Sequence, residues 1–106
     1  MIPSETRLAL IDRATDLVGA PGLSPATLTA FIRHLRRGDL DVSDWHRCDD
    51  LAASGRMTHH QARTAVAQLV QAGLMERDVV PRRVERRDRR YTAYRLTQAA
   101  VAGAER

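Results

Sequence analysis

The chain has 106 residues, of which 43% are hydrophobic and 28% are charged, a composition that suits one globular domain and excludes a disordered segment. No apolar run approaches the ~20 residues needed to cross a bilayer, and the N-terminus lacks the apolar core of a secretory signal, so we expect a cytoplasmic protein with no membrane partner. The net charge of +4 is compatible with a polyanionic partner, and Cys48, the only cysteine, cannot form an intrachain disulfide.

Two helices are predicted in the first part of the chain. Ser4 can cap the first helix, which runs to about Val18. Its apolar residues form one row of Leu10, Ala14 and Leu17 with a second row of Leu8 and Ile11 beside it. Ser24 followed by Pro25 is a typical helix start, and Gly38 ends this second helix.

A connector and a third helix follow. Residues 39–42 alternate polar and apolar side chains over too few positions for more than a short strand or a turn, so we treat them as a connector. Ser43 can cap a third helix that breaks near Gly55 and carries Trp45 and Cys48 on its core-facing side.

The strongest helix signal in the chain covers residues 58–72. The hydroxyl of Thr58 can accept from the amide of Gln61, whose side chain reaches back to the Thr58 amide, and this is a capping box. Apolar residues at helical spacing follow as Ala62, Ala65, Val66, Leu69 and Val70. Gly73 suits the left-handed residue that ends a helix, and Leu74 would fold back on the last turn.

The helical period disappears after this helix. Met75 and Val79, and later Thr92, Tyr94 and Leu96, suit two half-buried strands, whereas residues 81–90 are too charged to be buried. We therefore expect a hairpin with a long basic loop. A short terminal helix, which Thr97 can cap, is predicted over residues 98–104.

Arginine is concentrated in the hairpin. All 17 basic residues are arginine, for which a bias in codon usage is the simpler explanation, but eight of them lie between residues 77 and 95. A local block of like charges repels itself, so this clustering points to an anionic partner. A solvated charge run without a partner is the alternative.

The order of these elements is typical of a winged helix-turn-helix, with the helix-turn-helix at about 43–73 and the wing at about 74–96. The segments SGRMTHHQARTAVAQLVQAGLMERD and DRRYTAYRLTQAA resemble the DNA-binding core of MarR-type transcriptional regulators, and the resemblance covers roughly residues 43–100. It implies a recognition helix that ends in a glycine-leucine step and a wing that carries a D-x-R motif, here residues 88–90. We expect one domain over residues 1–106, mainly α with a small β-hairpin (α+β).

The predicted recognition helix has a face that suits DNA. With its apolar residues packed inward, the helix turns His60, Thr64, Ala67 and Gln71 outward, with Arg63 and Gln68 on the flanks. In the major groove arginine can pair with guanine and glutamine with adenine. The predicted DNA-binding residues are Arg56, Thr58, His59, His60, Arg63, Thr64 and Gln68 in the helix-turn-helix, and Arg82, Arg83, Arg86, Arg87, Arg89 and Arg90 in the wing.

The sequence thus predicts a transcriptional regulator, expected to be a repressor, that binds double-stranded DNA sequence-specifically. One recognition helix reads only a few base pairs, so we expect a homodimer, with the first helix and the terminal helix as candidate dimer surfaces. Two alternatives stay open. One is the winged-helix domain of a plasmid or phage replication or partition protein, and the other is a winged-helix module that binds a protein partner.

Catalytic and metal sites are not expected. The sequence has no glycine-rich phosphate loop, no nucleophile elbow and no recognisable carboxylate pair, so we predict no enzymatic activity and no cofactor. His46 and Cys48 resemble half of a metal site, but two residues that lie two apart on one predicted helix point in different directions. The sequence specifies no small-molecule effector.

Overall fold

The computed structural model describes residues 2–38, 40–84 and 87–105, with the backbone alone described at 80–84 and 87–90. The helices are α1 (Ser4–Asp16), α2 (Pro25–Arg37), α3 (Cys48–Gly55), α4 (His59–Gln71) and α5 (Gln98–Ala104), and the strands are β1 (His46–Arg47), β2 (Met75–Val84) and β3 (Arg87–Leu96). The strands form an antiparallel sheet in the order β1-β3-β2. The predicted α+β class, mainly helical with a small sheet, is confirmed.

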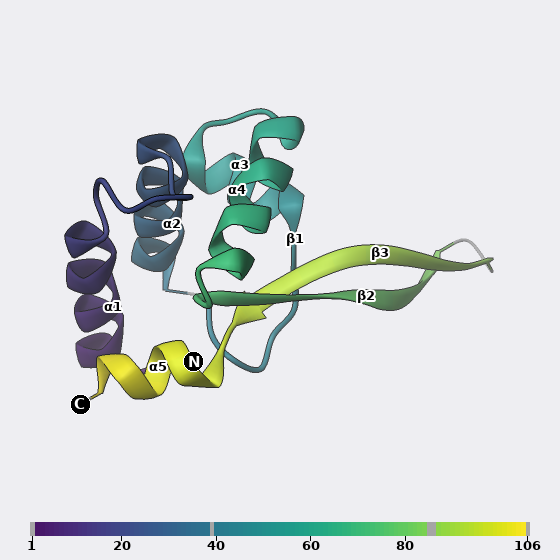
Figure 1. Ribbon diagram of the computed structural model, residues 1–106. Coiled ribbons are helices and arrows are strands. Elements are labelled where there is room, and N and C mark those ends of the chain that lie inside the picture. Colours follow the sequence, from purple (N-terminus) through teal and green to yellow (C-terminus); the bar gives the residue numbers. More distant parts are fainter. Residues whose placement is uncertain (1, 39, 85–86, 106) are drawn as a thin grey trace.

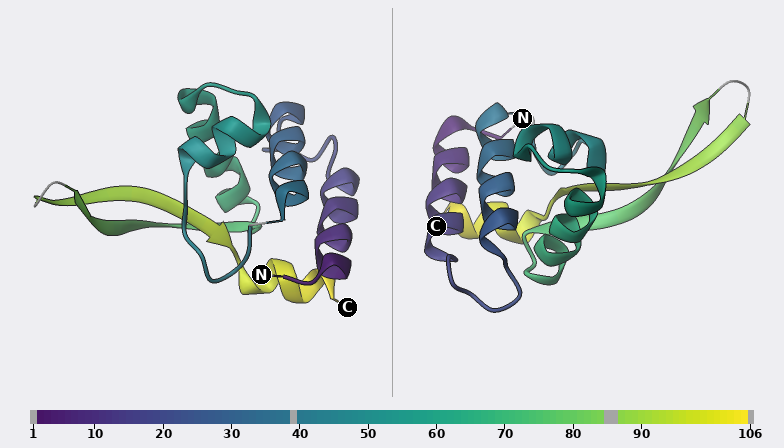
Figure 2. Two further views of the ribbon diagram at one scale, coloured as in Figure 1. Left: turned by 180° about the vertical axis from the view of Figure 1, so that it is seen from behind. Right: turned by 90° about the horizontal axis from the view of Figure 1, so that it is seen from above.

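The helices form one body from which the hairpin of β2 and β3 extends (Figure 1). α2, α3 and α4 pack against one another, α1 packs on α2, and α5 packs on α1. Two further views show that the hairpin leaves this body on the side away from α1 (Figure 2). Each hairpin strand has ten residues, which at ~3.3 Å per residue gives a reach of about 30 Å. No helix in the described parts of the chain is long and apolar enough to span a membrane.

The core joins the helices to the base of the hairpin. Phe31 of α2, Leu51 of α3 and Leu69 of α4 are each 0% exposed, and Tyr94 and Leu96 of β3 are buried with them. Burial of one large apolar side chain contributes about 1.5–3 kcal/mol. The base of the hairpin is therefore held by the same core as the three helices.

The first two helices differ in how well their starts were predicted. α2 has the predicted ends, because the Ser24 hydroxyl accepts from the amide of Thr27 (3.2 Å) and Gly38 adopts the left-handed conformation with φ 84°. In α1 the predicted cap is wrong. Ser4 is already helical, Pro3 occupies the capping position, and the helix ends at Asp16. Leu10 and Ala14 are buried as expected, Ile11 and Leu17 are partly buried, and Leu8 is 58% exposed.

The third helix starts later than predicted. Ser43 does not cap this helix but lies in a turn that Asp41 holds. Oδ1 of Asp41 accepts from the amides of Ser43 (2.9 Å) and Asp44 (2.8 Å). The chain then forms β1, which pairs with β3, and α3 begins only at Cys48. The side chain of Asp41 thus holds the turn that brings β1 onto the sheet.

Asp41 is a buried carboxylate, only 2% exposed. Burial alone would raise its pKa, but hydrogen bonds from the amide of Asp44 and from the amide and hydroxyl of Ser43 hold that pKa well below its usual value of 3.8. A carboxyl group whose pKa is lowered by folding stabilises the fold fully above its ordinary pKa, and this contribution is lost as the pH falls through the lowered value.

Asp41→Ala is expected to lower the free energy of unfolding at pH 7 by about 1–3 kcal/mol, because it removes the charged acceptor of the Ser43 and Asp44 amides. The deficit should begin to shrink below about pH 4, because the Asp41 carboxylate of the unfolded chain then binds a proton while that of the folded protein, with its lowered pKa, does not. Urea unfolding at pH 7 and at pH 3 measures both effects. Asp44→Ala, at an exposed position in the same loop, is the control and should change little. An equal deficit at both pH values would show that the charge of Asp41 does not contribute.

α3 and α4 are joined by a tight connection. A Cβ on Gly55 would lie 2.6 Å from the Cβ of Ala30, so glycine lets α3 approach α2 closely. Arg56 then adopts a left-handed conformation with φ 55° and ends α3. α4 ends as predicted, because Gly73 is left-handed with φ 79° and the amide of Leu74 donates to the Leu69 carbonyl (3.0 Å).

The hairpin is longer in its strands and shorter in its loop than predicted. Residues 81–84 and 87–90, expected in a basic loop, continue the strands, with Pro81 paired to Arg90 and Val84 to Arg87. The high charge of these residues excluded burial, and we therefore predicted a loop. Strands that project from the helical body, however, do not need a buried face. Pro81 has no amide hydrogen to donate, but β2 is an edge strand whose outer side forms no hydrogen bonds to another strand, so proline is compatible with it.

Candidate nucleic-acid interface

The solvent face of α4 is polar, as predicted. The residues on it that are exposed are His60, Arg63, Thr64, Ala67 and Gln71. The opposite face is buried, with Ala62, Val66 and Leu69 each at 0–1% exposure. No large apolar side chain lies among these exposed residues, so the face suits hydrogen bonding to a polar partner better than an apolar docking surface.

The N-terminal end of α4 is fixed by the predicted capping box. The Thr58 hydroxyl accepts from the amide of Gln61 (3.1 Å), and Oε1 of Gln61 accepts from the amide of Thr58 (2.8 Å). Thr58 is exposed, but its hydroxyl oxygen is already engaged in the cap. Of the predicted DNA-binding residues, Thr58 thus has a structural task at the start of the helix.

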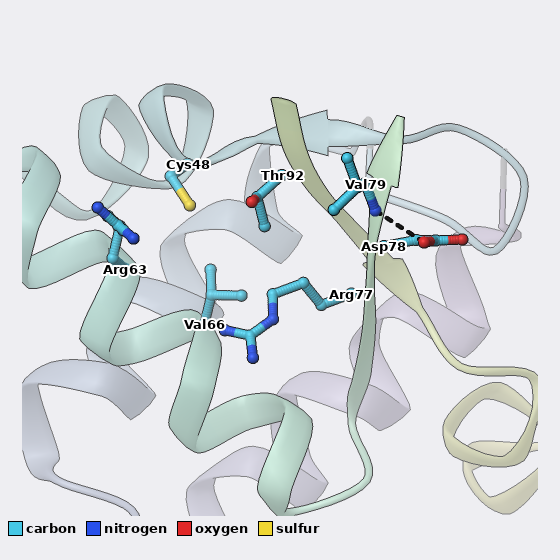
Figure 3. Close-up of a pocket in the computed structure, with 7 residues that line it drawn as sticks. All are labelled: Cys48, Arg63, Val66, Arg77, Asp78, Val79 and Thr92. Carbon is cyan, nitrogen blue, oxygen red and sulfur yellow. Dashed lines mark hydrogen bonds between the residues drawn. The ribbon is translucent and has the colours of Figure 1, made fainter. Parts of the chain in front are cut away.

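A basic groove lies between α4 and the base of the hairpin. Its larger part, about 430 Å³, is drawn in Figure 3 and is lined by Cys48, Arg63, Val66, Arg77, Asp78, Val79 and Thr92. A smaller adjoining part of about 280 Å³ shares Cys48, Arg63 and Thr92 and adds Arg47, His59 and Tyr91. We call the two parts together the hairpin groove. Arg63 from α4, Arg77 from β2 and Arg47 from β1 bring three cations to one concave surface.

Arg47 and His59 are positioned in this groove by Asp49. Nδ1 of His59 lies 2.7 Å from Oδ1 of Asp49, and Nη2 of Arg47 lies 3.6 Å from Oδ2 of the same carboxylate. The guanidinium of Arg47 also lies over the ring of Tyr91, 5.3 Å from its centroid. These groups are largely exposed, so the ion pairs add little stability. Their effect is to orient the side chains beside α4.

Gln68, one of the predicted DNA-binding residues, is only partly exposed on the flank of α4 that packs against α2. Its Oε1 accepts from the hydroxyl of Thr27 (2.7 Å) and from the amide of Ser24 (3.0 Å). Helical spacing predicted a flanking position, and the flank proves to be covered by the start of α2. Gln68 therefore ties α4 to α2.

A second basic groove lies on the other flank of α4, between α4, α2 and the turn after α3. We call it the α2 groove. It has a volume of about 390 Å³ and is lined by Ser24, Ala26, Thr27, Thr29, Arg33, Gly55, Arg56, Met57, His60, Gln61 and Thr64. Arg56, His60 and Thr64, all predicted DNA-binding residues, thus meet Arg33, which the sequence did not single out. Nη1 of Arg33 donates to the carbonyl of Gly55 (3.4 Å).

The predicted arginines of the wing fall in the least described part of the chain. The backbones of Arg82, Arg83, Arg87, Arg89 and Arg90 belong to the paired strands, but their side chains, and Arg86 altogether, lie outside the described residues. In the strand register Arg82 is directly opposite Arg89. The next pair in the register sets Arg83 opposite Asp88, so the Arg82–Arg89 pair is the one place in the described register where two basic residues are opposed.

Arg95, at the end of the basic segment, has a different environment. Its guanidinium lies 4.1 Å from the centroid of the Trp45 ring, and its Nε donates to Oε1 of Glu76. Trp45, expected in the core, is only partly buried and is covered by this arginine. Arg95 thus fastens the base of the hairpin to the loop before β1.

Cys48 lies at the floor of the hairpin groove as a buried thiol, 7% exposed. Burial raises the pKa of this thiol, and the nearby Arg63 only partly opposes the effect. The thiol is therefore neutral at pH 7 and a weak nucleophile. Within the described residues, no three His, Cys, Asp or Glu side chains are grouped so that they could hold a metal ion.

Several residues of the two grooves were absent from the predicted DNA-binding set, and Arg77 of the hairpin groove is one of them. Arg47 and Tyr91 line the hairpin groove, and Arg33 lines the α2 groove. Arg47 was placed inside the third helix, where its pairing with β3 could not be foreseen. Arg33 lies on the polar side of α2, and only the packing of α2 against the turn after α3 brings it near α4.

Comparison with known protein families finds no model that matches this chain, and comparison with curated proteins finds no match either.

Proposed function

We propose that this chain is a transcriptional regulator, acting as a repressor, that binds double-stranded DNA sequence-specifically through a winged helix-turn-helix. The observation that carries the proposal is the juxtaposition of the polar face of α4 with the basic hairpin groove. In this interpretation α4 is the recognition helix in the major groove, and the hairpin is the wing on the backbone or in the minor groove.

The dimensions and chemistry of α4 support this assignment. An α-helix is about 10–12 Å across, and the major groove of B-DNA is about 12 Å wide. The exposed side chains of α4 are arginine, histidine, threonine, alanine and glutamine. These types supply donors, acceptors and methyl groups that distinguish base edges, whereas none of them needs an apolar pocket.

The hairpin supports the proposal through its charge. Like charges directly opposite in a pair of strands destabilise the pairing, and Arg82 faces Arg89 in this register. A polyanion relieves that repulsion. Arginine is also suited to phosphate, because its planar group can donate two parallel hydrogen bonds. The hairpin would then supply sequence-independent affinity, while α4 supplies the choice of sequence.

The order of elements and the resemblance to MarR-type regulators agree with this proposal. A homodimer on two half-sites, with α1 and α5 as the contact surface, would multiply the specificity of one short helix. The winged-helix domain of a plasmid or phage replication or partition protein would bind DNA in the same way. Selection of bound duplexes from random DNA, read by sequencing, should return a palindrome if the protein binds as a homodimer on two half-sites.

The second candidate function is a protein-binding module whose arginines meet an acidic surface. Fluorescence anisotropy with random and selected duplexes at 50–200 mM salt discriminates DNA binding from protein binding. Over this range of salt, about six phosphate contacts would cost on the order of 10³-fold in affinity. If the protein binds DNA, its affinity for both duplexes should fall steeply as the salt concentration rises, and it should bind the selected duplex more tightly than the random one. Absence of binding, or binding that ignores salt, would overturn the DNA proposal in favour of a protein partner.

Arg63→Ala is expected to weaken binding to the selected duplex by about 1–3 kcal/mol and to random DNA by less, because Arg63 is the exposed cation on α4 nearest the base edges in this mode. Arg36→Ala, at an exposed position on α2 outside both grooves, is the matched control and should bind like the wild type. Equal losses on both duplexes would assign Arg63 to the phosphates instead of the bases.

A further inference from the structure

The two grooves lie on opposite flanks of α4. Successive residues of a helix turn by about 100°, so Arg63 and Val66 face the hairpin groove, while His60, Gln61 and Thr64 face the α2 groove. The exposed face of α4 lies between them. Any partner that receives this face in a groove of its own must therefore meet both flanks.

The α2 groove has the composition of an anion site. Arg33 from α2 and Arg56 from the turn bring two guanidinium groups to it, and Thr29 and Thr64 bring hydroxyls. None of the described residues that line it carries a carboxylate. Arg33 is half-buried and donates one hydrogen bond to Gly55, which leaves further donors of its five for a ligand.

We infer that the α2 groove binds phosphates of the DNA strand opposite to the strand that the hairpin groove contacts. The inference rests on the proposed function. A helix about 10–12 Å thick fills a major groove about 12 Å wide, so the two phosphate backbones that border the groove come to lie beside the two flanks of the helix. One backbone meets Arg47 and Arg77, and the other meets Arg33 and Arg56.

Two substitutions test the role of this groove with little disturbance of the fold. Arg56 adopts φ 55°, a conformation that glycine adopts without strain, so Arg56→Gly removes the cation while keeping or raising the melting temperature. Arg33→Ala removes the second cation. Arg36→Ala is the matched control, because Arg36 is exposed on the same helix and does not line the groove.

Salt titrations of these variants on the selected duplex give the first result. Arg33→Ala and Arg56→Gly should each lower the slope of log K against log salt by about one, and should weaken selected and random duplexes equally, whereas Arg36→Ala should match the wild type. Unchanged slopes for both variants, with wild-type binding intact, would overturn this inference and leave the proposed function standing. Failure of the wild type to bind DNA would overturn both.

Replacement of single phosphates by uncharged methylphosphonates assigns the strand. In the wild type we expect sensitive positions on both strands that border the site of α4. Arg33→Ala and Arg56→Gly should abolish the sensitivity on one strand, and Arg77→Ala should abolish it on the other. Loss of sensitivity on the same strand for all three variants would contradict the assignment of the two grooves to opposite strands.

Discussion

Tyr94→Ala is expected to lower the free energy of unfolding by about 3–5 kcal/mol, as is usual when a fully buried aromatic residue is truncated. Tyr94 is 0% exposed in β3. Its ring stacks on His46 of β1, with centroids 6.0 Å apart, and its hydroxyl lies 3.1 Å from Nε2 of His34 in α2. The loss would be a large fraction of the 5–15 kcal/mol that stabilises a typical domain.

Chemical denaturation of three variants separates the contributions of Tyr94. Tyr94→Phe keeps the ring and removes the hydroxyl, so it should cost about 1 kcal/mol. Thr92→Ala changes an exposed position two residues earlier on the same strand and should cost little. A Tyr94→Ala protein as stable as the Thr92→Ala protein would mean that the hairpin is not anchored in the helical core.

The contacts of Tyr94 also give His34 and His46 a structural role. His34 is 0% exposed, and its Nδ1 lies 3.1 Å from the hydroxyl of Ser54, which donates to the carbonyl of Asp50 (2.9 Å). The chain of contacts runs from β3 through α2 to α3. It fixes the hairpin relative to the helices, and so the width of the hairpin groove depends on it.

Local signals predicted the elements that are held by local interactions. The start of α2 at Ser24, the capping box of α4 and the left-handed Gly73 each depend on residues within one helical turn. Such bonds form wherever the same few residues occur together. The terminal helix belongs to this group, because the Thr97 hydroxyl accepts from the amide of Ala100 (3.1 Å).

Elements that depend on distant partners were predicted less well. β1 exists because His46 and Arg47 pair with Tyr94 and Ala93, almost fifty residues later in the chain. The strands of the hairpin continue through residues 81–84 and 87–90 because each strand supplies the other with backbone partners, and periodicity does not record this pairing. A short sequence window therefore assigned β1 to a helix and the outer hairpin to a loop.

The residues of the candidate interface show the same difference between local and distant interactions. The exposed face of α4 follows from helical spacing, so His60, Arg63 and Thr64 were found. Gln68 is also polar and lies one helical turn after Thr64, yet the start of α2 packs against it. Whether a polar residue on the flank of a helix faces solvent or a neighbouring helix is decided by tertiary packing.

The largest functional effect is expected when the basic residues of the outer hairpin are replaced by glutamine. The changed positions are Arg82, Arg83, Arg86, Arg87, Arg89 and Arg90. Each arginine that contacts a phosphate contributes about 0.9 to the salt slope, so loss of several contacts should weaken DNA binding on the order of 10³-fold at physiological salt. The preference for the selected duplex should largely remain, because α4 is unchanged.

The melting temperature of the glutamine variant is the control that separates a loss of DNA binding from a loss of folding. The hairpin strands are paired through their backbones and project from the core. Removal of the like charges of Arg82 and Arg89 offsets the loss of the opposite charges of Arg83 and Asp88, so the melting temperature should change little. A matched variant with lysine at the same six positions keeps the charge and should retain most of the salt slope. If the glutamine variant kept the wild-type slope, the phosphates would have to be held by the two grooves beside α4, and the hairpin would be free to meet a different partner.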